Sequence, residues 1–240
     1  LTFNSSFMKK LLLVFTCLLA VAVLNAQSLE EIVKKYSEAN KLDKLSSIKT
    51  IKITGSMSMM GQEFTFERWM KNPNKIKIVT NVMGQQTVQA FDGEKGYMIN
   101  PMMGSTDPVE MTPDQLGETQ RDNIFRNYVI DDMKNGKLSL VGEESVNGNP
   151  SFKIKGVAEG VKSMYMFIDK SSYLLTKMTM EVEQQGQSAT VDMFFSDFKD
   201  TDGVFLPMKT TISSQGMEFV MTCTKVEVNI PMEDSIFKLK

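Results

Sequence analysis

Methionine is the residue type in this chain whose number and spacing could do chemistry, because 20 of the 240 residues are methionine. Several stand two apart in apolar segments, and another follows downstream: Met57 and Met59, Met164 and Met166, Met178 and Met180, and Met193. Thioethers are soft ligands that suit Cu(I), so one interpretation is a copper-handling protein. The other is a flexible apolar lining, since methionine is unbranched and adapts to partners of varied shape. The pairs lie in regular strand alternation, so we favour the lining and expect no metal site.

Histidine is absent from the sequence, which removes the usual general base of nucleophilic triads and the commonest transition-metal ligand. Two acidic pairs remain as candidates for catalysis or cation binding, Asp92 with Glu94 and Asp200 with Asp202. Both include an Asp-Gly step, which is a common turn former, and neither has a nearby nucleophile or the further ligands of a calcium loop. We therefore predict hairpin turns there, and expect no enzymatic activity, no catalytic residue and no cofactor.

The first 26 residues have the pattern of an export signal. Met8 is followed by two lysines, an apolar run from Leu11 to Leu24, and a small residue at Ala26. A charged start, a short apolar run and a small residue are typical of a cleaved signal peptide. We predict cleavage after Ala26, a few upstream residues before Met8, and a periplasmic location.

The remaining segment, 27–240, is long enough for one domain with its own core. Cys223 is its only cysteine, so no disulfide within the domain is expected. The whole chain has 27 basic and 29 acidic residues, and these charges are not clustered. This balance argues against nucleic acid as a partner. We expect a monomer.

Two segments have helical patterns. The stretch from Ser28 to Ala39 opens with a capping box, Ser28 and Glu31, and carries one apolar stripe, which predicts an amphipathic helix. The stretch from Thr112 to Gly136 also opens with capping-box spacing and predicts an inserted helical segment with a polar start.

The rest of the chain alternates with a period of two, which predicts strands. Between Thr50 and Met59, apolar side chains occupy the odd positions Ile51, Ile53, Met57 and Met59. Further strands are expected at 62–71, 75–82, 86–91, 96–100, 137–142, 151–158, 163–169, 173–184, 188–199, 204–213 and 217–229. Together these segments predict an α+β domain, in which a long antiparallel sheet is accompanied by an N-terminal helix and an inserted helical segment. The only tryptophan, Trp69, alternates out of phase with Phe64 and Phe66, and is either a packed aromatic or part of a cavity rim.

Two motifs resemble a known family. "RWMKNPNKIKI" (68–78) and "QAFDGEKGYMINP" (89–101) are similar to segments of exported lipid-binding proteins of the LolA, LolB and LppX type, which include outer-membrane lipoprotein-sorting proteins. "DGVFLP" (202–207) and "DSIFKLK" (234–240) extend the likeness. The resemblance implies an incomplete antiparallel β-barrel of about 11 strands, covered by the N-terminal helix and the inserted helical segment. It also implies a non-enzymatic carrier or sensor that shields a lipid or lipoprotein acyl chain in an apolar cavity.

Combining the resemblance with the alternation gives an expected binding site. Its lining would come from Met57, Met59, Phe64, Phe66, Met164, Met166, Met178, Met180 and Met193, with Trp69 and Tyr97 nearer the rim and Met102 and Met103 at the mouth. Outer-membrane or inner-membrane proteins are the expected partners. One position departs from the family: the arginine that precedes proline in the lipoprotein carrier is Asn72 here, which cannot make a charge-assisted contact. A Cu(I)-handling protein and a ligand-free interaction module are the alternatives.

Overall fold

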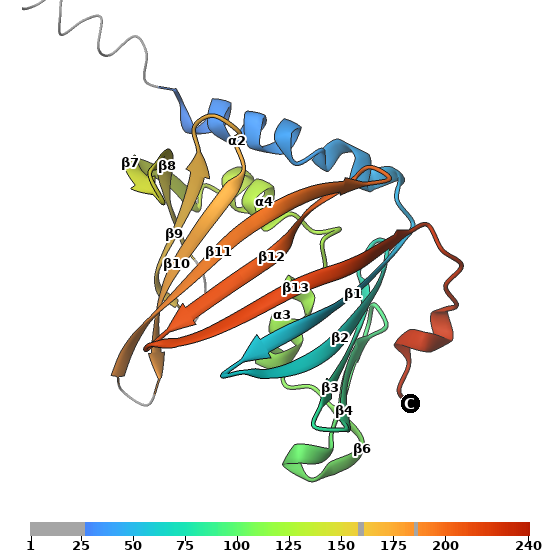
Figure 1. Cartoon of the computed structure of the whole chain (residues 1–240). Helices are drawn as coiled ribbons and strands as arrows, with labels where there is room; N and C mark the ends of the chain where they lie inside the picture. The colour runs from blue at the N-terminus through green and yellow to red at the C-terminus, as the bar shows by residue number, and fades with distance from the viewer. Residues whose placement is uncertain (1–26, 158–160, 185–186) are drawn as a thin grey trace, which may run out of the picture.

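The computed structural model describes residues 27–157, 161–184 and 187–240, so the expected signal segment, 1–26, lies outside the described residues. Within those ranges no helix is long and apolar enough to cross a membrane. The protein is built on one antiparallel sheet of 13 strands with a few short helices, and the sheet does not close on itself (Figure 1). The expected α+β class and incomplete barrel are confirmed.

The sheet consists of two meanders that meet at their first and last strands. The first comprises β1 (Thr50–Met59), β2 (Gln62–Lys71), β3 (Lys75–Val82), β4 (Gln85–Phe91), β5 (Gly96–Asn100) and β6 (Ser105–Glu110). The second comprises β7 (Leu138–Val146), β8 (Asn149–Gly156), β9 (Val161–Asp169), β10 (Leu175–Gln184), β11 (Gln187–Thr201), β12 (Val204–Ser214) and β13 (Met217–Val228). Pairing of β1 with β13 joins the meanders and leaves β6 and β7 as the free edges.

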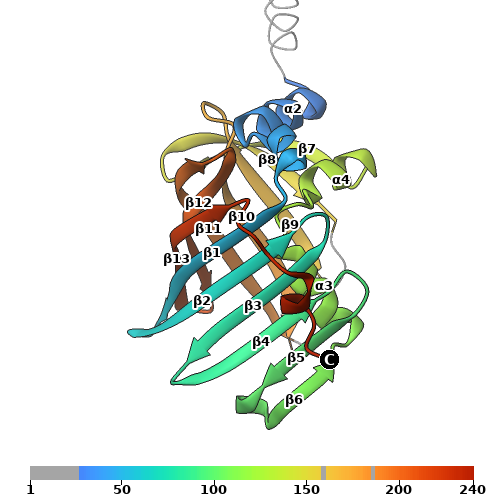
Figure 2. The same ribbon diagram turned by 90° about the vertical axis from the view of Figure 1, so that its right-hand side faces the viewer.

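The chain between the two edge strands forms two helices rather than one. These are α3 (Pro113–Arg121) and α4 (Tyr128–Lys134). The capping box at Thr112 is present, as predicted. The break occurs because Asn127 accepts a hydrogen bond from the Ile130 backbone N–H at 3.1 Å and so starts a second helix. The sheet curls around α3 and α4, so these helices lie on its inner side (Figures 1 and 2).

The N-terminal helix α2 (Leu29–Ala39) has the predicted capping box and lies across one end of the curled sheet (Figure 1). Its buried side chains join the inner side of β7, β8 and β9 in a first core. This core consists of Ile32, Val33, Tyr36, Leu138, Phe152, Ile154, Met166 and Ile168. Burial raises the pKa of the Tyr36 hydroxyl, so this residue stays neutral and packs as an aromatic.

A second core forms at the other half of the sheet. It consists of Ile48, Ile51, Ile53, Phe66, Met70, Ile76, Phe91 and Val204. Leu116 of α3 packs against it, together with Ile124 and Phe125 from the α3–α4 connection. The short helices η1 (Leu42–Ser47), η2 (Pro101–Met103) and η3 (Asp234–Phe237) complete the fold. The two cores hold the two meanders in place, with the middle of the sheet between them.

Candidate functional site on the concave face

Strand register defines which side chains share the inner, concave face of the sheet, because directly opposed residues of paired strands point to the same side. Phe64 lies opposite Met57, which in turn lies opposite Met221 of β13. On the second meander, Met193 lies opposite both Met178 and Ile212. Because Met178 and Met221 also pack against the cores that contain α2 and α3, this face is the one turned towards the helices.

The nine methionine and phenylalanine residues expected to line the cavity all lie on the concave face. Their pairings connect Met164 and Met166 with Met180 and Met178, and Met57 and Met59 with strand β2. Phe64, Phe66, Met164 and Met166 are buried in the cores or beside them. Met57, Met59, Met178, Met180 and Met193 are only half-buried. That they bind a ligand remains a prediction.

A half-exposed apolar surface therefore crosses the middle of the concave face between the two cores. We call it the central strip; it consists of Met57, Met59, Met178, Met180, Val191, Met193, Phe195, Ile212, Phe219 and Met221. Most of its members are methionines, whose side chains can change shape at low cost. A curled sheet that leaves such a surface half-covered offers a place for a long apolar ligand.

Arg68 is a functional candidate that the sequence reasoning missed. It lies opposite Ile53 and Ile78, and so points to the concave face. Its Nη2 donates to the sulfur of Met221 at 3.6 Å and lies 3.4 Å from a carboxylate oxygen of Asp122, the residue after α3. Its Nε is buried and has no hydrogen-bond partner among the described residues. The signal was present in the sequence, since position 68 alternates in phase with Phe64 and Phe66.

Cys223 lies on the same face, opposite Gly55. Burial raises the pKa of its thiol, and the nearby positive charge of Arg68 only partly offsets that effect. A thiol is nucleophilic as its thiolate, so a raised pKa lowers the reactivity of this cysteine. Across residues 27–157, 161–184 and 187–240, no group of three or more histidine, cysteine, aspartate or glutamate side chains could hold a metal ion.

The structure places Trp69 and Tyr97 on the convex face, away from the other expected lining residues, and their part in binding remains a prediction. Trp69 is opposite Lys52 and Lys77, and the Lys52 ammonium lies 4.0 Å from the centre of its ring. Tyr97 is opposite Ala90, out of phase with the concave face. Trp69 instead borders a hollow of about 260 Å³. The C-terminal segment with η3 lies over this side of the sheet (Figure 2).

That C-terminal segment is fixed by one carboxylate and two lysines. Asp234 of η3 forms ion pairs with Lys71 at 2.7 Å and with Lys75 at 2.8 Å. These contacts lower the pKa of Asp234 to about 2. Asn72, between the strands that carry the two lysines, donates from its side-chain amide to the Ile48 carbonyl at 2.9 Å. The Asn72 side chain therefore has a local structural contact with the chain that precedes β1.

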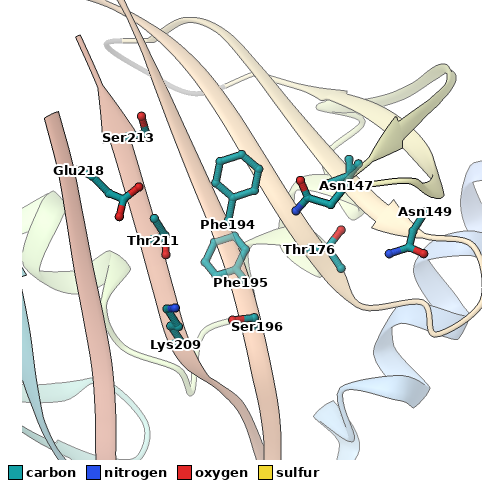
Figure 3. Close-up of a pocket in the computed structure, with 11 residues that line it drawn as sticks. Asn147, Asn149, Thr176, Phe194, Phe195, Ser196, Lys209, Thr211, Ser213 and Glu218 are labelled. Carbon is teal, nitrogen blue, oxygen red and sulfur yellow. The ribbon is translucent and has the colours of Figure 1, made fainter. Parts of the chain in front are cut away.

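A second hollow, of about 520 Å³, lies on the convex face of the second meander (Figure 3). Phe194, opposite Lys177 and Thr211, marks this face. Asn147 and Asn149 approach it from the β7–β8 turn, and polar side chains of β12 and β13 form the other side (Figure 3). Its lining mixes hydroxyl, amide and charged groups with the ring of Phe194, which suits an acyl chain less well than the central strip.

Met102 and Met103 lie in η2 and are exposed, at 58% and 78%. They belong to a row of exposed methionines in the turns at one end of the strands. We call this row the methionine rim; it consists of Met60, Met83, Met102, Met103 and Met217. These turns lie at the same end of the strands because the end of β1 pairs with both the start of β2 and the start of β13. That Met102 and Met103 form the mouth of a cavity remains a prediction.

The open antiparallel sheet curled around short helices is similar to solved structures of a LolA superfamily protein and of a putative outer membrane lipoprotein-sorting protein domain. The resemblance inferred from the sequence is confirmed at the level of the fold. No family model matches the sequence, and no curated protein matches it.

Three solved structures illustrate the likeness. A putative outer membrane lipoprotein-sorting protein domain from Vibrio parahaemolyticus has a TM-score of 0.58 at 11% identity, over 86% of this chain and 94% of that one. A DUF1329 family protein from Desulfovibrio piger has a TM-score of 0.59 at 14% identity, over 86% and 97%. A LolA superfamily protein from Nitrosomonas europaea has a TM-score of 0.54 at 12% identity, over 82% and 96%. At these identities the likeness concerns the fold.

Proposed function

We propose that this protein is a non-enzymatic carrier or sensor that holds an acyl chain of a lipid or lipoprotein against the central strip. The observation that carries the proposal is the half-exposed apolar surface on the concave face between the two cores. Each Å² of apolar surface removed from water contributes about 25 cal/mol, so an acyl chain laid along the central strip would gain from contact along its whole length.

The chemistry of the central strip fits acyl chains of varied shape. Methionine side chains such as Met57, Met178 and Met193 can repack around a kinked or straight chain without the loss that a rigid, branched lining would suffer. The structures with a similar fold include one described as a putative outer membrane lipoprotein-sorting protein domain, which supports the same class of ligand. We further propose that the protein acts in the periplasm as a monomer, after export, and exchanges its ligand with a membrane protein partner.

The test compares neighbouring residues on opposite faces of β11. Met193 lies on the concave face and Phe194 on the convex face, and both are half-buried. Met193→Glu places a carboxylate in the path of the acyl chain, whereas Phe194→Glu places the same group on the other side of the sheet. We expect Met193→Glu to weaken binding of a fluorescent acyl probe by at least about tenfold, since an unpaired charge is costly in an apolar contact.

Native mass spectrometry of protein purified gently from its host supplies the independent readout. Wild type and Phe194→Glu are expected to carry lipid mass, and Met193→Glu to lose it. Thermal unfolding of both variants serves as the control for folding. The proposal fails if the wild type is strictly free of lipid and does not bind the probe, or if the two glutamate variants bind the probe equally well.

A further inference from the structure

The guanidinium of Arg68 marks one end of the central strip. Its Nη2 contacts the sulfur of Met221, a member of the strip, at 3.6 Å. Its charge also lies 5.3 Å from the centre of the Phe66 ring in the second core. The Arg68 side chain is 22% exposed, so part of it remains accessible although its Nε atom is buried. A positive charge therefore stands beside the surface on which the acyl chain would lie.

This charge is incompletely satisfied within the protein. Nε and Nη2 share one edge of the guanidinium and can donate two parallel hydrogen bonds to one carboxylate or phosphate. Nε has no partner among the described residues, although its atom is buried. Nη2 lies 3.4 Å from Asp122, longer than the usual distance of about 2.7–2.9 Å for a charge-assisted hydrogen bond. A buried donor without a partner is costly, so a better acceptor at this edge would be favourable.

We propose that the ligand is an amphiphile with an anionic head, whose carboxylate or phosphate binds the Nε and Nη2 edge of Arg68 while its acyl chain lies along the central strip. This inference rests on the proposed function and specifies the chemistry of its ligand. The incoming anion competes with Asp122, whose own side chain is 41% exposed and can turn to solvent without being left buried. The exchange leaves the net charge around Arg68 balanced in both states.

The test uses three amphiphiles of equal chain length: dodecanoic acid, dodecyl phosphate and dodecanol, each competing with a neutral fluorescent acyl probe above the pKa of the acid. Wild type is expected to bind the two anions at least about tenfold more tightly than the alcohol, as a bidentate charged contact contributes more than a neutral one. In Arg68→Gln this preference is expected to disappear while alcohol binding remains. The acid and the phosphate, compared directly, distinguish the two kinds of head group.

Two further variants keep the test independent of any loss of folding in Arg68→Gln. Asp122→Asn removes the competing charge, so anion affinity should rise several-fold with alcohol affinity unchanged. Lys52→Met is the matched control, because Lys52 occupies the neighbouring strand, pairs with Glu67 at 2.9 Å, and points to the convex face. It should retain the full preference for anions.

The outcomes separate the two levels of the proposal. Equal affinity of wild type for acid, phosphate and alcohol would overturn the anionic head group but leave acyl-chain binding intact. A preference for anions that survives Arg68→Gln, or that is unaffected by Asp122→Asn, would overturn the role of Arg68. Failure of all three amphiphiles to displace the probe, or of the probe to bind, would overturn the proposed function itself.

Discussion

Alanine at Gly55 should weaken the fold far more than alanine at Gly156, although both glycines are buried on the concave face. A Cβ built at Gly55 would lie 2.2 Å from the backbone oxygen of Thr222 and 2.6 Å from the ring of Phe66. Neither can retreat without moving a strand or a core ring. Overpacking of this kind costs about 1–3 kcal/mol or more, against a gain of about 0.4–1 kcal/mol from the less flexible unfolded chain. We expect Gly55→Ala to lower the free energy of unfolding by about 2 kcal/mol.

A Cβ at Gly156 would also meet an atom at 2.2 Å, but this is the terminal methyl of Met164. A flexible thioether can rotate away, so the gain from the unfolded state offsets most of the cost, and the free energy of unfolding should change by less than about 1 kcal/mol. Urea unfolding followed by the fluorescence of Trp69 would measure both. Equal losses in the two variants, or a loss below about 0.5 kcal/mol in Gly55→Ala, would refute the reasoning that Phe66 packs directly over the β1–β13 pairing.

Three further predictions concern the ends and turns of the sheet. Asp234 has a pKa of about 2 in the folded protein, against an ordinary value of 3.8. Its contribution to stability is therefore complete above the ordinary value and is lost as the pH falls through about 2. NMR signals of η3 should shift in that pH range, and in the Asp234→Asn variant they should be shifted already at neutral pH. Met60 and Met83 adopt a φ of 50° before glycines at 78° and 81°. This turn favours asparagine, so Met60→Asn and Met83→Asn should each raise the melting temperature slightly, and a lower value would contradict the turn assignment. Ser28→Ala should cost about 1 kcal/mol and speed hydrogen exchange in α2, whereas unchanged exchange would mean that the capping box contributes nothing.

Alternation of apolar and polar residues was enough to predict the concave face, because each strand has one buried side and its phase is visible in the sequence. The phase of Phe64 and Phe66 fixes that of Arg68, and a charged residue in an apolar phase is itself a signal of a site. The same phase excludes Trp69 from the concave face. Its position in a family-like motif suggested a role at the rim, yet a motif does not determine which way a side chain points.

Two features of the fold lacked a strong local signal. The edge strand β6 contains Pro108 and mostly polar residues, and an edge strand tolerates proline because one side of its backbone needs no partner. The division of the inserted segment into α3 and α4 depends on one hydrogen bond that the Asn127 side chain accepts from the Ile130 backbone N–H, and a continuous helix is the simpler interpretation of the same residues. The convex hollow of the second meander depends on how the sheet curls, which no local pattern encodes.

The contrast between the methionine rim and the buried methionines has a consequence for oxidative chemistry. Met60 is 82% exposed and Met166 is 2% exposed, so a mild oxidant should convert the rim to sulfoxides while the first core stays reduced. Members of the central strip such as Met57 and Met193 are half-buried and fall between these limits. The rate at which these methionines form sulfoxides would then report whether the central strip is covered by a ligand. Methionine oxidation can therefore serve as a footprinting assay for ligand binding on the concave face.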